Sequence, residues 1–159
     1  MADARVQGKV RLPVDSAFDI YVNQMDTWWP RRGVFPYSFA PRSTQPQHIR
    51  FEAEPGGRYY ETFADGSEYI IGRIQVWEPP ELLVYTWRDP SWRGETVVTV
   101  FFQQVESGTE IICEQEGFAD AGVPELADYY QIGNRQTLAG YIAHCQAIYE
   151  LGLLEAGKS

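Results

Sequence analysis

The chain has 159 residues, of which 44% are hydrophobic and 14% aromatic, so it can bury one good core, and residues 1–159 are predicted to form a single domain. The formal net charge of −9 disfavours nucleic acid and anionic membrane surfaces as partners, because both are bound through clustered Lys and Arg. No apolar run is long enough for an export signal or a membrane span, so we expect a soluble, cytoplasmic protein without membrane insertion.

The first third of the chain is predicted to hold one strand and two short helices. Weak alternation over residues 5–12 favours a strand, and the proline that follows ends it. An acidic and a hydroxyl residue can cap a short helix over about 15–22, and residues 24–29 are typical of a second helical turn. Residues 30–46 contain four prolines and no periodicity, which predicts a surface loop long enough to suggest a role.

The middle of the chain alternates as an antiparallel meander, and the end of the chain predicts a long helix. Strands are expected at about 48–54, 57–64, 68–77, 82–88, 95–105 and 109–117. After a mixed segment at 119–132, residues 134–154 place apolar side chains three and four positions apart, which indicates an amphipathic helix. The predicted class is α+β, with a curved antiparallel sheet of about six or seven strands around this helix.

Turn positions predict which strand residues share a face. If Asp65-Gly66 is a two-residue turn, Glu61 pairs with Ile70 and Tyr59 with Gly72. One face of this hairpin then carries Tyr59, Glu61, Phe63, Ile70, Gly72 and Ile74. We expect that face to form part of a cavity wall.

A second hairpin leads to the same conclusion for the later strands. If Ser107-Gly108 is a turn, Phe102 pairs with Cys113 and Val100 with Gln115. One face then carries Val98, Val100, Phe102, Gln104, Ile111, Cys113 and Gln115, and the opposite face is charged, with Glu110, Glu114 and Glu116. The first face is therefore predicted to be the inner one, joined by Leu83, Tyr85 and Trp87. The expected wall is aromatic, with Glu61, Gln104 and Gln115 as its polar members.

This order of elements resembles the helix-grip fold of the START-like, birch-pollen-allergen-like superfamily. The segments TWWP (27–30), EPGGRYY (54–60), IIGRIQVWEPPELLVYTW (70–87) and SGTEII (107–112) resemble the family named after the activator of the Hsp90 ATPase. The superfamily hosts binders, transfer proteins and cyclases, so the resemblance implies ligands such as lipids or polyketides but no single function. In one departure, Gly133-Asn134 stands where the family usually has a Gly-Trp pair opening the last helix.

The favoured hypothesis is a binding protein that holds a small apolar or aromatic molecule between the sheet and the last helix. The candidate ligand-binding residues are Trp28, Tyr59, Glu61, Phe63, Tyr85, Trp87, Phe102, Cys113, Gln115, Leu138, Tyr141, Ile142 and Cys145. Of the pair Trp28-Trp29, only one side chain need reach the cavity, and the other can pack the short helices onto the sheet. The two cysteines and two histidines lack ligand spacing, so we expect neither a metal nor a cofactor, and the protein is predicted to be a monomer or homodimer.

Three alternatives remain open at this point. Glu61 is a weak candidate for the acid or base of a cyclase, dehydratase or hydrolase, because an apolar pocket raises the pKa of a carboxyl group; it can equally bond a ligand or pair with Arg58 or Arg73. A chaperone-partner role follows only from the family name. The Arg31-Arg32 pair can receive an anionic group or form a solvated turn.

Overall fold

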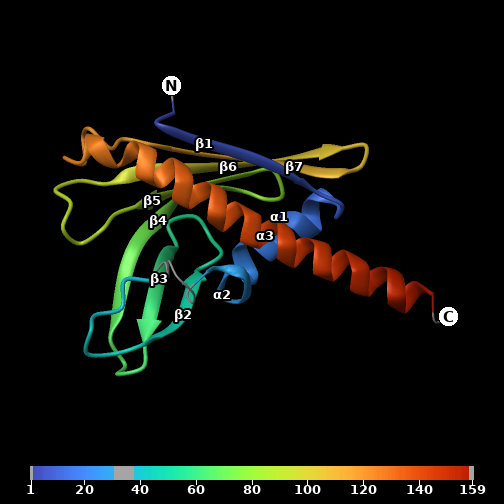
Figure 1. Ribbon diagram of the computed structural model, residues 1–159, viewed down its shortest axis with the longest axis horizontal. Coiled ribbons are helices and arrows are strands. Elements are labelled where there is room, and N and C mark those ends of the chain that lie inside the picture. The colour runs from blue at the N-terminus through green and yellow to red at the C-terminus, as the bar shows by residue number, and fades with distance from the viewer. Residues whose placement is uncertain (1, 31–37, 158–159) are drawn as a thin grey trace.

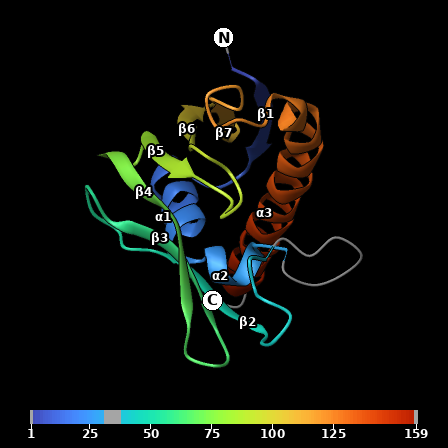
Figure 2. The same ribbon diagram turned by 90° about the vertical axis from the view of Figure 1, so that its left-hand side faces the viewer.

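The computed structural model describes residues 2–30 and 38–157, which form one seven-stranded sheet with helices against its inner face (Figures 1 and 2). The strands are β1 (Ala4–Val10), β2 (Pro46–Phe51), β3 (Arg58–Phe63), β4 (Glu68–Glu78), β5 (Leu82–Trp87), β6 (Thr96–Val105) and β7 (Gly108–Glu116). The helices are α1 (Val14–Asn23), α2 (Met25–Trp28), the 3-10 turn η1 (Pro124–Leu126) and α3 (Ala127–Ala156). The sheet order is β1-β7-β6-β5-β4-β3-β2, and neighbouring strands are antiparallel.

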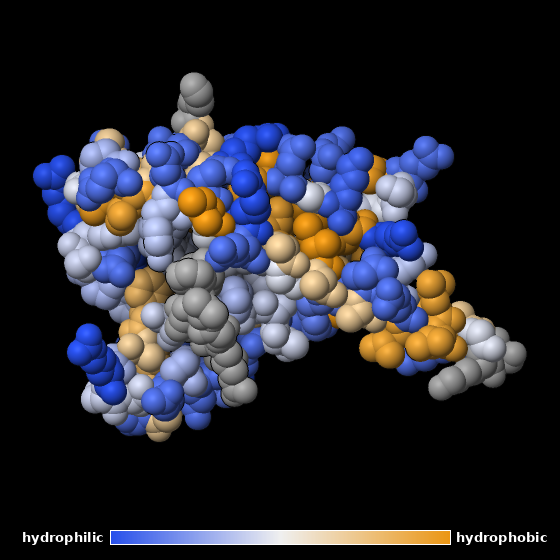
Figure 3. Space-filling view, viewed as in Figure 1, coloured by the Kyte–Doolittle hydropathy of each residue, from blue (hydrophilic) through white to orange (hydrophobic). Residues whose placement is uncertain are grey.

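The predicted α+β helix-grip architecture is confirmed, with one change in the last helix. Helix α3 begins at Ala127, directly after η1, and not at Asn134. Residues 127–132, which belong to the segment that the sequence analysis describes as mixed, therefore form the first turns of α3. These turns lie over the β5–β7 part of the sheet (Figure 1). At its other end α3 extends past the sheet, and exposed leucines gather there (Figures 1 and 3).

The first hairpin corrects the predicted register near its turn. The N–H of Gly66 donates to the Phe63 carbonyl over 3.0 Å, and φ of Gly66 is +88°, so residues 64–66 form a three-residue loop with glycine in the left-handed region. This change shifts the pairing by one residue: Glu61 faces Tyr69, and Ile70 lies on the outer face. A bulge then restores the expected pair of Tyr59 with Gly72.

The second hairpin is shifted by two residues, which leaves the predicted faces intact. Phe102 pairs with Ile111 and Val100 with Cys113. Because side chains alternate with a period of two, such a shift changes each partner but not the side of the sheet. Gln104 is the exception to the predicted wall: its side chain accepts from the Val14 N–H and donates to the Gly108 carbonyl at the end of the sheet.

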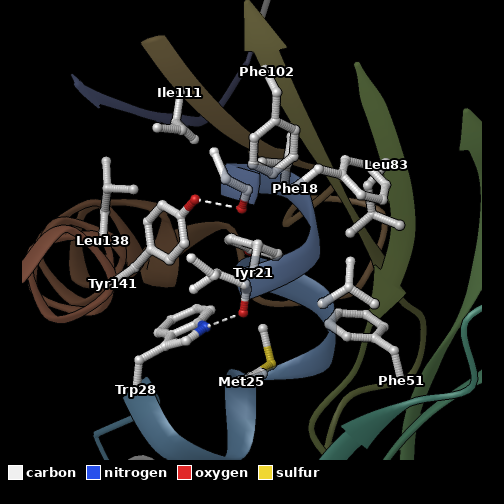
Figure 4. Packing of buried hydrophobic residues seen from close by; sticks show 14 of the residues in the cluster. Phe18, Tyr21, Met25, Trp28, Phe51, Leu83, Phe102, Ile111, Leu138 and Tyr141 are labelled. Atoms are coloured by element: carbon white, nitrogen blue, oxygen red, sulfur yellow. Dashed lines mark hydrogen bonds between the residues drawn. The ribbon is translucent and has the colours of Figure 1, made fainter. Parts of the chain in front are cut away.

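Helices α1 and α3 fill most of the space on the inner face. The hydroxyl of Tyr141 in α3 donates to the Ala17 carbonyl of α1 over 2.6 Å, and Phe18 packs edge-on against Phe102 of the sheet (Figure 4). Helix α3 also lies against β1, where the amide side chain of Gln131 bonds both the N–H and the carbonyl of Arg5, at 2.7 and 2.8 Å. The sheet therefore packs against α1 and α3 together.

Candidate functional site

A cavity of about 190 Å³ lies between β5–β7 and the first half of α3. An enclosed apolar cavity of about 150 Å³ is enough to hold benzene, so this volume suits a small ring system. The surrounding side chains come from α1, the segments that follow α2 and β5, the sheet and α3. They belong to Tyr21, Trp29, Ser38, Phe39, Tyr85, Trp87, Asp89, Val98, Cys113, Gln115, Tyr129, Tyr130, Gly133, Asn134 and Thr137.

A second hollow lies on the outer side of the sheet, and its chemistry differs. Its volume is larger, about 740 Å³, but its lining includes Glu78, Glu81, Glu114 and the exposed Phe101. An open, acidic surface of this kind offers little burial to a ligand. The candidate site is therefore the smaller cavity on the inner side.

Aromatic rings surround Trp87 and form one wall of the cavity. Its ring centroid lies 5.9 Å from that of Trp29, 5.4 Å from that of Phe39 and 6.4 Å from that of Tyr130. The indole N–H of Trp87 also donates to the Tyr130 hydroxyl over 3.4 Å. These contacts join the β5 wall to α3 and to the segment after α2, so a planar ligand would meet rings from three parts of the chain.

Another part of the cavity lining carries hydroxyl and thiol groups that remain uncharged at neutral pH. The hydroxyls of Tyr21 and Tyr85 are 2.9 Å apart and share one hydrogen bond, and burial raises the pKa of both well above the ordinary value. Burial, assisted by the charge of Glu114, raises the pKa of Cys113 to about 12. These groups therefore offer weak polar contacts without a charge.

Gln115 connects the sheet to α3 through a row of hydrogen bonds along the cavity. Its amide nitrogen lies 2.9 Å from the hydroxyl of Thr96, which in turn lies 2.9 Å from the Trp87 carbonyl. Its amide oxygen accepts from the side-chain nitrogen of Asn134 over 2.9 Å. Asn134 is thus a residue of α3 whose side chain borders the cavity. It occupies the position at which the family usually has the Trp of a Gly-Trp pair.

Glu61 is fully buried, but its carboxylate turns to the chain segment beside the cavity rather than into the cavity lining. One oxygen accepts from the Ser38 hydroxyl over 2.5 Å, and the other from the Phe39 N–H over 2.7 Å. Charge-assisted bonds of this kind are among the stronger ones in proteins. Glu61 therefore holds in place two residues that do line the cavity.

The structure brings only some of the sequence candidates to the cavity. Tyr85, Trp87, Cys113 and Gln115 line it, whereas Trp28, Tyr59, Glu61, Phe63, Phe102, Leu138, Tyr141, Ile142 and Cys145 do not. Most of this second group belongs to the packed core. The physical reason is that α1 and the ring of Tyr141 fill the space under the middle of α3, which the sequence prediction of one sheet and one long helix does not account for.

The two tryptophans of the TWWP segment divide the roles that the sequence left open. The Trp28 indole donates to the Ile20 carbonyl over 3.1 Å and packs against Tyr21 and Tyr141 (Figure 4). Trp29 is the member that reaches the cavity. The Trp-Trp pair therefore indicates that one ring contributes to the cavity, but the sequence alone does not say which of the two it is.

Several cavity residues were missed by the sequence analysis. Tyr129 and Tyr130 fall in the segment that was not recognised as helix, and Phe39 falls in the predicted loop. The Arg31-Arg32 pair, for which the sequence leaves an anion contact and a solvated turn open, lies outside the described residues. Only Asn134 carried a signal, as the departure from the family pattern.

The histidines lie away from the cavity and have ordinary partners. His48 lies 2.7 Å from an Asp26 carboxylate oxygen, and His144 lies 2.8 Å from the amide oxygen of Gln24. Within the described residues no group of three His, Cys, Asp or Glu side chains is arranged to hold a metal ion. In the same residues no helix is both long and apolar enough to cross a membrane.

Comparisons with known proteins extend these observations. Solved structures with similar folds include a protein from Rhodobacter sphaeroides (18% identity, 94% of this chain and 95% of that one, TM-score 0.66) and CV1439 from Chromobacterium violaceum (23%, 89% and 96%, 0.63). CalU16 from Micromonospora echinospora is also similar (16%, 87% and 69%, 0.56), and at these identities all three show the fold alone. No curated protein matches the sequence. Residues 11–140 match the family described as "Activator of Hsp90 ATPase homolog 1-like protein", and the chain therefore belongs to that family.

Proposed function

We propose that the protein binds a small apolar or aromatic molecule in the cavity between the curved sheet and the first half of α3. The observation that supports this most directly is the ring-lined volume of about 190 Å³, with Trp29, Phe39, Trp87 and Tyr130 around it. Cavities of this type bind through apolar contact and use a few placed polar groups for orientation.

Simple area arithmetic indicates a modest affinity. A ligand that buries about 200 Å² of apolar surface gains about 5 kcal/mol at roughly 25 cal/mol per Å² before the costs of association. The rings that line the cavity already pack on one another, which reduces the cost of ordering them. We therefore expect weak binding of simple aromatic probes, with dissociation constants in the millimolar range, about −4 kcal/mol.

The arrangement of Glu61 favours binding over acid–base chemistry. A general acid or base must reach the reacting group, within about 2.6–3.2 Å or through one water. Glu61 instead accepts bonds from Ser38 and Phe39 and lies outside the cavity lining. Burial raises the pKa of Tyr21, Tyr85 and Cys113, which do line the cavity, so none of these three is an ionised base at neutral pH. We therefore assign Glu61 a positioning role and do not propose a reaction.

Two measurements test the proposal. Native mass spectrometry of freshly purified protein should reveal a retained small molecule, and calorimetric titration with 2-naphthol should show saturable binding. Thr137→Phe should abolish 2-naphthol binding, because Thr137 lines the cavity and a phenyl ring would fill it.

The matched control is Ala139→Phe, which adds the same ring to the exposed face of the same helix. It should leave affinity unchanged, with folding of both variants checked by circular dichroism. If the wild type binds neither a retained molecule nor 2-naphthol, or if Thr137→Phe binds as well as the wild type, the proposed site is wrong.

A further inference from the structure

We propose that this cavity, if it has the binding function proposed above, selects neutral ligands whose polar end donates a hydrogen bond and rejects anionic ligands. The proposal depends on three features of the described residues: the direction of the hydrogen bonds through Gln115, the acceptor that this direction leaves on Asn134, and the charges around the cavity.

The hydrogen bonds through Gln115 run in one direction only. A backbone carbonyl can only accept, so the Thr96 hydroxyl proton points to the Trp87 oxygen, 2.9 Å away. The same hydroxyl must then receive an N–H from Gln115, because two oxygen atoms 2.9 Å apart without a proton between them repel. This fixes the amide orientation of Gln115 through its neighbours and leaves its oxygen facing α3.

The direction of this row determines what Asn134 offers to a ligand. Because the Gln115 oxygen needs a donor, Asn134 turns its NH₂ group to it, at 2.9 Å. The remaining polar atom of the Asn134 side chain is Oδ1, which can only accept. No residue within 2–30 or 38–157 donates a hydrogen bond to this oxygen, and Asn134 lines the cavity. A ligand hydroxyl or N–H group is the complement that satisfies it.

The other polar groups around the cavity are also poor partners for an anion. The hydroxyl protons of Ser38 and Thr137 are committed to Glu61 and to the Asn134 carbonyl. The Tyr21–Tyr85 pair keeps one proton free, and the Tyr130 hydroxyl, which accepts from the Trp87 indole, keeps its own, so these groups supply only neutral donors. Asp89 brings a carboxylate to the lining, and no Lys, Arg or His is among the described residues that line it. Among the described residues, a buried anion would thus lose its hydration without gaining a cation.

Three naphthalene probes separate the possibilities because they share one ring system. 2-Naphthol carries a neutral donor, 2-methoxynaphthalene has no donor, and 2-naphthoate is anionic at pH 7. We expect 2-naphthol to bind about three- to tenfold more tightly than 2-methoxynaphthalene, the usual worth of one neutral hydrogen bond. The carboxylate should bind at least about 100-fold more weakly than 2-naphthol, because no described residue of the lining offers it a cation.

Two variants test whether the preference for 2-naphthol depends on the Asn134 side-chain oxygen. Asn134→Leu should lower 2-naphthol affinity to that of 2-methoxynaphthalene while leaving the latter within about twofold, since only the acceptor is lost. Gln146→Leu is the matched control, because it removes an amide of the same helix that bonds Glu150 outside the cavity lining, and it should keep the preference. Since Asn134→Leu can also weaken folding by leaving the Gln115 oxygen without a donor, the comparison of probes on the wild type decides the matter independently.

Each outcome bears on the inference in a defined way. Equal binding of all three probes, or stronger binding of 2-naphthoate, overturns the selectivity and leaves the binding function standing. Retention of the 2-naphthol preference in Asn134→Leu, or its loss in Gln146→Leu, overturns the role of Asn134. Binding of none of the probes, together with no retained molecule, removes both the inference and the function on which it rests.

Discussion

Replacing Glu61 tests whether its buried carboxylate positions the cavity wall. Glu61→Ala removes the acceptor of the Ser38 hydroxyl at 2.5 Å and of the Phe39 N–H at 2.7 Å. Hydrogen bonds to a charged group are worth about 1.5–3 kcal/mol each, so we expect the free energy of unfolding to fall by about 3–6 kcal/mol. At about 2–4 °C per kcal/mol for a domain of this size, the melting temperature should fall by about 6–24 °C.

Two milder variants separate positioning from chemistry. Glu61→Gln keeps one oxygen for the Phe39 N–H, and Ser38→Ala removes one bond while leaving the sheet intact, so each should cost about 1–2 kcal/mol. Both should also weaken 2-naphthol binding, because the ring of Phe39 lies 5.4 Å from that of Trp87 in the cavity wall. Urea unfolding followed by circular dichroism, with calorimetric titration, measures both effects.

The reasoning is refuted if Glu61→Gln and Ser38→Ala both unfold at the wild-type urea concentration. A different result would favour the enzyme hypothesis that the sequence allowed. In that case Glu61→Gln would leave stability and binding unchanged but abolish turnover of the molecule retained by the purified protein.

Three further predictions concern packing and reactivity. Phe102→Ala should cost about 3–5 kcal/mol in urea unfolding, because its ring lies in close-packed core and not at the cavity; a cost below about 1 kcal/mol would contradict that placement. Gly72→Ala should prevent stable folding, since its Cβ would stand 1.8 Å from the Thr86 carbonyl oxygen, whereas Gly152→Ala has open space and should add about 0.5–1 kcal/mol. The pKa of Cys113 is raised to about 12 from 9.0, so its contribution to stability is present below pH 9 and is lost as pH rises from 9 to 12. Iodoacetamide should modify this thiol more slowly at pH 8 than in urea, and equal rates would contradict its partial burial and raised pKa.

The sequence predicted the faces of strands better than their pairings. In β6 and β7 the register differs by two residues from the prediction, yet Val100, Phe102 and Ile111 are buried as expected, because alternation alone decides the face. In the first hairpin a shift of one residue moved Ile70 to the outer face. That shift depends on a three-residue turn that Asp-Gly spacing does not distinguish from a two-residue one.

The cavity was less predictable because tertiary packing decides where space is left. Alternation placed Tyr85, Cys113 and Gln115 on the inner face, and all three line the cavity. It could not show that α1 fills the volume beneath Tyr141, which leaves the open space at the other end of α3. Nor could it bring in Phe39, whose position depends on a hydrogen bond to a residue far away in the sequence.

The contact between Gln131 and Arg5 has a consequence for how the molecule meets its neighbours. β1 is an outermost strand of the sheet, and such strands offer unpaired N–H and carbonyl groups to which a foreign strand can add. By presenting an amide to both groups of Arg5, α3 imitates the missing neighbour. A strand from another molecule can pair with β1 at this position only after α3 has moved away. The helix therefore protects this edge of the sheet from aggregation.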